Sequence, residues 1–225
     1  MIEERLVRTT FRQQLDSLQA DLGDMCAVAG DAVERATQGL LDADAEVARE
    51  VTRDIDRLRH LHHGVERSAL GILARQAPVA GDLRTVVTAL HVAADADRMG
   101  GLAAHVAKVS LRRHPESAVP GELRARFEEM GSTAVGLARR CHHILTTGDC
   151  SQAQRVWSED RVMETMHREL FAAVTSPRWA HGAMVASDVV LLGRFYGRFA
   201  DHADEIARRM VFQSSGEAPE REHAV

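Results

Sequence analysis

The chain carries an internal duplication. Residues 98–108 return one hundred positions later at 198–208, and residues 25–51 return at 130–156 with an offset of 105. The matched pairs include Arg98 with Arg198, Ala103 with Ala203, Met25 with Met130, and Leu40 with Leu145. Two copies of one unit of about a hundred residues, with five residues lost from a connection in the second, explain both offsets. The fold is therefore expected to be built twice from one pattern.

Each copy reads as three helices. Apolar residues between Met25 and Leu41 recur at steps of three and four, which is typical of an amphipathic helix. Asp42 and Asp44 are N-cap candidates for a second helix, and Pro78 interrupts the pattern before a third. The helices expected after that break lie at about 82–113, 122–145, 151–174 and 181–212.

The sequence thus predicts an all-α fold of two tandem antiparallel three-helix bundles related by the internal repeat. The first repeat is assigned to residues 8–113 and the second to residues 121–213. Residues 114–121 contain two prolines and a glycine and form the linker between them. The polar tail, residues 214–225, is expected to be disordered.

Bulk properties exclude several classes of protein. The formal net charge of −5 argues against a nucleic-acid-binding protein, which would usually be basic. The three cysteines show no CxxC spacing, so reduced thiols are expected rather than disulfides or a cysteine zinc site. The charged start of the chain is unlike a signal peptide, and no apolar stretch is long enough to span a membrane. We expect a cytoplasmic protein with no membrane insertion.

Three segments resemble one family. Residues 77–84 are similar to a P-x-A-x-D-L-R turn, residues 94–101 to an E-R-x-G-D helix, and residues 193–203 to the counterpart of that helix in the second repeat. In this order and at this spacing they resemble the PhoU family of phosphate-uptake regulators. The resemblance covers about residues 8 to 217, including the duplication and the three-helix rhythm.

The resemblance implies a function as well as a fold. PhoU-like proteins are tandem three-helix bundles, often homodimers, and are not established enzymes. They are thought to link the ATPase of a phosphate ABC transporter to a sensor histidine kinase and to keep phosphate-starvation genes off. The resemblance therefore implies a non-enzymatic adaptor that represses phosphate-starvation signalling and phosphate uptake.

The family also implies metal ligands, which this chain retains only in part. Several members bind metal clusters through carboxylates four residues apart on the second and third helices of each repeat. The positions that keep an acid are Asp56, Asp97, Asp160, Glu164 and Asp201, whereas Arg59, Gly101, Arg161 and Gly197 stand where partner acids are expected. Carboxylates at i and i+4 share one helix face and suit a hard cation. With half the donors gone, we expect at most a weakly bound divalent metal or iron, and otherwise a solvated acidic face.

Other patterns allow alternatives. A metal-binding or metal-storage bundle that uses the remaining carboxylates is the second hypothesis for function. Glu164 and His167 have the E-x-x-H spacing of di-iron bundles, but the matching positions in the first repeat are Arg59 and His62. Arg98 and Arg198 occupy equivalent places; they are expected to form ion pairs with acids of the second helix of their repeats, with recognition of an anion as the alternative.

One helical segment is a candidate partner surface. It consists of Arg194, Phe195, Arg198 and Phe199, residue types enriched at protein interfaces. The alternative is that the two phenylalanines, four residues apart, fill the core of the bundle.

Overall fold

The computed structural model describes residues 2–217 and 219, with side chains from Thr9 onward. Helices account for nearly all of this part of the chain, and it contains no β-strand. The elements are α1 (Ile2–Leu41), α2 (Ala45–Gln76), α3 (Ala80–Arg113), η1 (Gly121–Leu123), α4 (Arg124–Thr147), η2 (Cys150–Gln152), α5 (Ala153–Thr175) and α6 (Gly182–Ser215).

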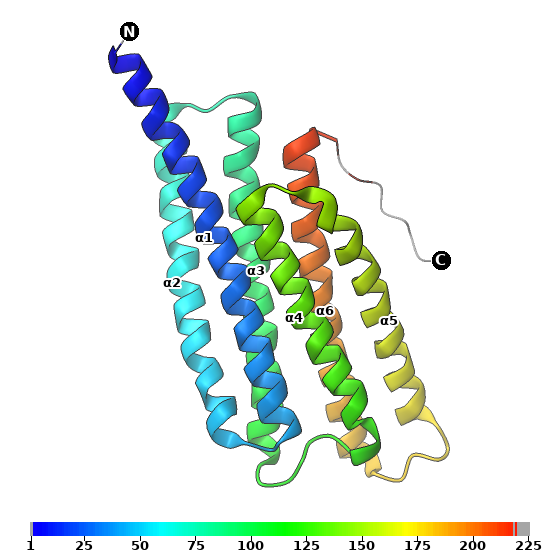
Figure 1. Ribbon diagram of the computed structural model, residues 1–225. Coiled ribbons are helices and arrows are strands. Elements are labelled where there is room, and N and C mark those ends of the chain that lie inside the picture. The colour runs from blue at the N-terminus through cyan, green and yellow to red at the C-terminus, as the bar shows by residue number, and fades with distance from the viewer. Residues whose placement is uncertain (1, 218, 220–225) are drawn as a thin grey trace.

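The six long helices form two three-helix bundles that lie side by side, α1–α3 and α4–α6 (Figure 1). The predicted all-α fold with two tandem bundles is confirmed. The bundles dock through α1 against α4 and α3 against α6. A Cβ atom on Gly23 would lie 3.3 Å from His142, and one on Gly131 would lie 2.4 Å from Thr37. Early α1 therefore meets late α4 and late α1 meets early α4, so the two helices are antiparallel.

Local sequence signals set most helix ends. The Asp44 carboxylate caps α2 by accepting hydrogen bonds from the backbone N–H groups of Glu46 (2.9 Å) and Val47 (3.2 Å). Helix α2 ends at Gln76 because Pro78 disfavours helical backbone in the residue before it. Gly148 follows α4 with a φ of 72°, a left-handed conformation that glycine adopts without strain.

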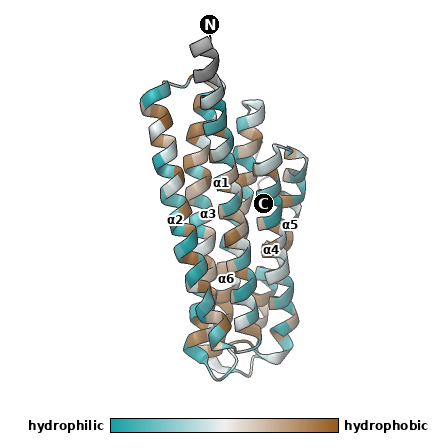
Figure 2. Cartoon of the chain, turned by 60° about the vertical axis from the view of Figure 1, so that its left-hand side comes forward, coloured by the Kyte–Doolittle hydropathy of each residue, from teal (hydrophilic) through white to brown (hydrophobic). Residues whose placement is uncertain are grey.

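Apolar side chains fill one continuous core through both repeats. In Figure 2 the outer faces of the helices carry many hydrophilic residues, as expected when each helix buries one stripe. Within the first repeat, Ser110 Oγ donates to the carbonyl oxygen of Gly39 at 2.8 Å. The hydroxyls of Thr37 on α1 and Tyr196 on α6 share a hydrogen bond of 2.7 Å across the joint between the bundles. The two repeats are therefore packed as one body.

Both ends of the chain differ from expectation. Helix α1 begins at Ile2, before the start assigned to the first repeat. Helix α6 extends to Ser215, so the predicted disordered tail begins with two helical residues; residues 218 and 220–225 of that tail lie outside the described part. None of the helices in residues 2–215 is long and apolar enough to cross a membrane.

Candidate functional site

A small acidic pocket opens between α5 and α6 in the second repeat. Its volume is about 290 Å³. Its lining consists of Asp160, Glu164 and His167 from α5, and Arg194, Gly197, Arg198 and Asp201 from α6. The structure thus brings together the three acids predicted for the second repeat. It also adds two arginines that the sequence had suggested as a partner surface.

Helix geometry and small residues position this pocket. Asp160 and Glu164 are four residues apart on α5, as Gly197 and Asp201 are on α6, so each pair shares a face. Gly197 leaves room, because a Cβ there would lie 3.9 Å from the nearest atom, in His167. Close helix contact depends instead on Gly193, whose Cβ would stand 3.1 Å from His167. Packing therefore explains Gly193 and leaves Gly197 as the open floor of the pocket.

The same distinction holds in the first repeat. A Cβ on Gly101 would meet nothing within 4 Å, whereas one on Gly100 would lie 2.2 Å from a methyl carbon of Leu58. Gly100 is therefore the residue that allows α2 and α3 to approach.

Burial and neighbouring acids make Asp160 unusual. Burial, together with the carboxylates of Asp204, Asp201 and Glu164, raises the pKa of Asp160 to about 7 against the lowering effect of Arg208. The pocket therefore holds a carboxyl group that exchanges its proton near neutral pH. Asp201 accepts a hydrogen bond from Arg198 at 2.8 Å.

Asp204 belongs to this acidic group but escaped the sequence analysis. One carboxylate oxygen accepts from Arg208 Nε at 2.8 Å, and the other is buried with no hydrogen-bond partner in the described residues. The Arg208 guanidinium also lies 5.2 Å from the centre of the Trp157 ring. The signal available in the sequence was its position one turn after Asp201 on the same helix.

The first repeat does not assemble an equivalent site. Asp56 is exposed and accepts from Arg59, three residues along the same helix, at 2.9 Å. Asp97 lies 3.9 Å from His62, which also approaches Glu66 at 3.7 Å. The two acids of the first repeat therefore have different neighbours, Arg59 for Asp56 and His62 for Asp97.

Neither repeat offers the donor set of a metal cluster. Across the part of the chain that the structure describes, no group of three or more His, Cys, Asp or Glu side chains is arranged to hold a metal ion. In the second repeat, Arg194 and Arg198 line the pocket beside the acids, and a cation there would compete with them. These residues do not fit the multinuclear site that the family implies. The weakly bound divalent ion stays a prediction.

The paired arginines are bound differently from expectation. Arg98 contacts Asp95 at 3.5 Å and Arg198 contacts Asp201, each on its own helix. The predicted pairing with acids of the second helix is therefore wrong: residues three apart on one helix are already neighbours, so the bond is local.

Asp95 ties the two repeats together. Its side chain is buried, with 5% of its surface exposed, and it accepts from His202 Nδ1 at 3.1 Å and from Arg209 Nε at 3.3 Å across the joint. Sequence reasoning passed over it, because a contact between residues more than a hundred positions apart leaves no local pattern.

Only some residues of the predicted partner surface are exposed. Phe199 is 1% exposed and fills the core, so it is removed from that surface; it faces inward with Tyr196 on the buried stripe of α6. Phe195 is half-buried and stacks on His105 with 5.1 Å between ring centres. Arg194 and Arg198 are exposed at the mouth of the acidic pocket.

The fold and site together define a duplicated helical bundle with a charged pocket in its second repeat. Comparison with known proteins identifies the family to which this bundle belongs. The PhoU domain matches residues 22–110 and 127–210, and the chain belongs to the PhoU family.

The chain is 47% identical over 213 residues to "Phosphate-specific transport system accessory protein PhoU homolog 2" of Mycobacterium tuberculosis, covering 95% of this chain and all of that protein. It is 45% identical to the PhoU homolog 1 of Mycobacterium leprae, covering 95% of this chain and 96% of that protein.

Solved structures show the same fold at lower identity. PhoU from Pseudomonas aeruginosa superposes with a TM-score of 0.82 at 22% identity, covering 92% of this chain and all of that one. The phosphate transport system regulatory protein PhoU from Streptococcus pneumoniae gives 0.83 at 19% identity, covering 93% of this chain and 99% of that one.

Proposed function

We propose that this chain is an accessory protein of a phosphate-specific transport system and a negative regulator of phosphate-starvation signalling. The observation that carries the proposal is the full-length similarity, at 47% identity, to a protein named for that accessory role. In this role the chain works in the cytoplasm as an adaptor between the ATPase of a phosphate ABC transporter and a sensor histidine kinase, and catalyses no reaction.

The packing of the repeats supports an adaptor mechanism. Buried bonds such as Thr37–Tyr196 and Asp95–His202 join the two bundles, so a contact made on one repeat is transmitted to a fixed position on the other. A rigid body can hold two proteins in one relative orientation, which is what an adaptor has to do. The exposed Arg194 and Arg198 give the second repeat a charged surface for one of these contacts.

The test is recovery of partners from phosphate-replete cells. Affinity-tagged protein is isolated at native level, and bound proteins are identified by mass spectrometry, with a tagged unrelated helical bundle as control. We expect enrichment of the transporter ATPase or of a sensor histidine kinase, and expression of phosphate-starvation genes when the chain is deleted. Deletion without any change in those genes would contradict the regulatory role.

A homodimer is part of the proposal. Family resemblance motivates it, and light scattering coupled to size-exclusion chromatography measures it directly. We expect twice the chain mass of 24.7 kDa at micromolar concentration. A constant mass of one chain across that range would show that the adaptor is monomeric.

The metal-storage alternative makes a contrary prediction that is easily measured. A storage bundle would purify with stoichiometric metal and lose helicity on chelation. For the adaptor, elemental analysis after purification is expected to give well under one metal per chain, and the circular dichroism spectrum is expected to be the same with and without chelator.

A further inference from the structure

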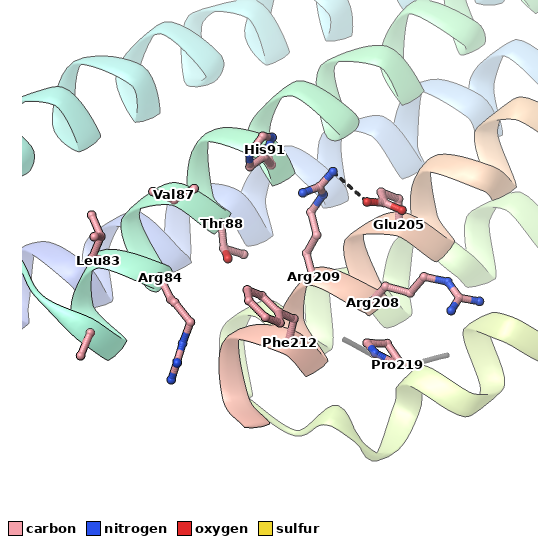
Figure 3. Close-up of a pocket in the computed structure, with 11 residues that line it drawn as sticks. Leu83, Arg84, Val87, Thr88, His91, Glu205, Arg208, Arg209, Phe212 and Pro219 are labelled. Carbon is pink, nitrogen blue, oxygen red and sulfur yellow. Dashed lines mark ion pairs between the residues drawn. The ribbon is translucent and has the colours of Figure 1, made fainter. Parts of the chain in front are cut away.

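A second, larger groove lies at the far end of the contact between α3 and α6. Its volume is about 610 Å³. Its walls are the first three turns of α3 and the last turns of α6, and Phe212 stands between them in Figure 3. This groove is separate from the acidic pocket, and none of its lining residues was singled out as a site by the sequence analysis apart from the turn that ends in Arg84.

The apolar part of the groove is a helical face that stays partly exposed, and Pro219 from the tail also lines the groove. Leu83, Val87 and Phe212 are each about two-fifths exposed, at 41%, 41% and 38%. The α3 residues that line it recur at steps of three and four from Ala80 to His91, and those of α6 do the same from Glu205 to Phe212. Two antiparallel helices that each offer such a face accept a third helix between them, and the α3 face is about 16 Å long, or three turns.

Positive charge borders this face. Arg84 forms no hydrogen bond or ion pair within the described residues, and its guanidinium lies against the last turn of α6, 3.3 Å from where a Cβ on Gly216 would stand. Arg209 lies at the inner end of the groove, where Glu205 and Asp95 bind it. A ligand that approaches the apolar face therefore meets at its edge the Arg84 cation, which pairs with no other side chain in the described part of the chain.

The internal duplication provides a comparison within the same molecule. At the mirrored end of the α3–α6 contact, the places of Leu83, Val87 and Phe212 are taken by Ala183, Ser187 and Arg112. There the chain supplies its own anion. Asp188 is buried, Arg112 donates to it, and Arg113 Nε donates to it at 2.6 Å.

The end of the α3–α6 contact that forms the groove differs both in its carboxylate and in the size of its apolar residues. Thr88 stands at the position equivalent to Asp188, so the carboxylate is missing, and large apolar residues replace small or charged ones. One end of the joint is closed by an internal ion pair, while the other offers apolar surface and a cation, Arg84, that no described carboxylate binds.

We infer that this groove is a docking site for an amphipathic α-helix of a partner protein, with apolar anchors along one face and acidic residues beside them. Helix-in-groove binding of this kind uses anchors at i, i+3 or i+4, and i+7, which matches the spacing of Leu83 and Val87 and the three-turn length. The identity of the partner rests on the proposed adaptor function; the chemistry of the helix rests on the groove alone.

The chemistry is tested with a designed probe. A fluorescein-labelled helical peptide of about 18 residues carries leucines at i, i+4, i+7 and i+11 with flanking glutamates, and a second peptide has lysines in place of the glutamates. Fluorescence anisotropy with the full chain is expected to show the acidic peptide binding at least about tenfold more tightly. Equal affinity for the two peptides, or no binding of either, would overturn the inference.

Substitutions locate the binding. Leu83→Glu or Phe212→Glu is expected to lower the affinity for the acidic peptide at least about tenfold, because each places a negative charge where an apolar contact is needed. Met184→Glu, at an exposed methionine in the second repeat (68% exposed), is the matched control and is expected to leave the affinity unchanged. Arg84→Glu should lower the affinity of the chain for the acidic peptide and raise its affinity for the lysine peptide. Identical affinities for the groove variants and the control would place the peptide elsewhere.

Other occupants give distinct results. If Leu83→Glu halves the mass of the protein by light scattering, the groove belongs to a second copy of the chain. If removing residues 218–225 raises the affinity for the peptide at least about tenfold, the groove belongs to the chain's own tail. If anionic phospholipid vesicles bind wild type but not Leu83→Glu, it belongs to a membrane surface. Each of these three results would overturn the inference.

A last measurement separates this inference from the proposed function. The purified transporter ATPase and the cytoplasmic part of the sensor kinase are each tested against wild type, Leu83→Glu and Met184→Glu. Loss of one partner with Leu83→Glu alone supports both proposals. Binding of both partners to all three proteins leaves the adaptor intact and refutes the groove. Failure of wild type to bind either partner refutes the adaptor.

Discussion

The most informative single residue is Asp160, whose carboxyl group has a pKa of about 7 in the folded chain, against 3.8 as the ordinary value. Between those values the folded chain holds a proton that the unfolded chain has released, so the free energy of unfolding falls as pH rises through this window. In Asp160→Asn that loss is absent.

We therefore expect Asp160→Asn to gain stability over wild type as pH rises from about 4 to 8. The side chain is part-exposed and solvent screens its charge, so the gain is set at about 1–2 kcal/mol. Urea unfolding at several pH values measures it, with Glu128→Gln, at an exposed carboxylate of α4 outside the pocket, as control. A difference between Asp160→Asn and wild type that is constant with pH would refute the assigned pKa.

The acids of the second repeat show how far single residues could be read from sequence. Asp160, Glu164 and Asp201 were expected at these places because they keep acids at positions where the family resemblance implies ligands, and i and i+4 positions share one helix face. Asp95 and Asp204 were not found. Their importance comes from burial and from neighbours on other helices. The spacing of residues along one helix does not determine how distant helices align with one another.

At the scale of a helix, alanine substitutions at two adjacent glycines of α3 are expected to change stability in opposite directions. Gly100→Ala places a methyl group 2.2 Å from buried Leu58 and should destabilise the protein by about 1–3 kcal/mol. Gly101→Ala meets nothing within 4 Å and should stabilise it by about 0.5–1 kcal/mol through helix propensity. Thermal unfolding of the pair serves as its own control. Changes of the same sign would show that packing does not decide between the two positions.

Helix existence was the easiest property to predict, and helix ends came next. Asp44 was foreseen as a cap and Pro78 as a break, because both act through the chain immediately beside them. The glycines at 101 and 197 drew attention in the sequence because they replace expected acids, but Gly100 and Gly193 are the ones at which the helices approach closely. Composition reveals that glycine is present, whereas only the position of the neighbouring helix reveals which one is needed.

The arrangement of the whole molecule shows both the strength and the limit of the duplication. The repeat predicted two similar bundles correctly, since equal sequence patterns bury equal stripes. How the bundles dock could not be inferred, because the antiparallel contact of α1 with α4 depends on small residues that meet across the joint. Gly30 faces Ala138, with 3.0 Å between an added Cβ and the alanine methyl, and Gly131 faces Thr37.

This docking predicts that the two repeats unfold together. Gly131→Val would drive a side chain into Thr37, 2.4 Å from the added Cβ, at the joint where Thr37 bonds Tyr196. We expect a loss of about 2–3 kcal/mol and a melting temperature lower by about 5–10 °C, in one calorimetric transition, because neither bundle keeps its core when the joint opens. Gly136→Ala, whose Cβ would meet only Glu159 at 3.7 Å, should melt within about 2 °C of wild type. Two separated transitions in Gly131→Val would mean that each repeat is stable alone, and the rigid coupling on which the adaptor proposal depends would then be lost.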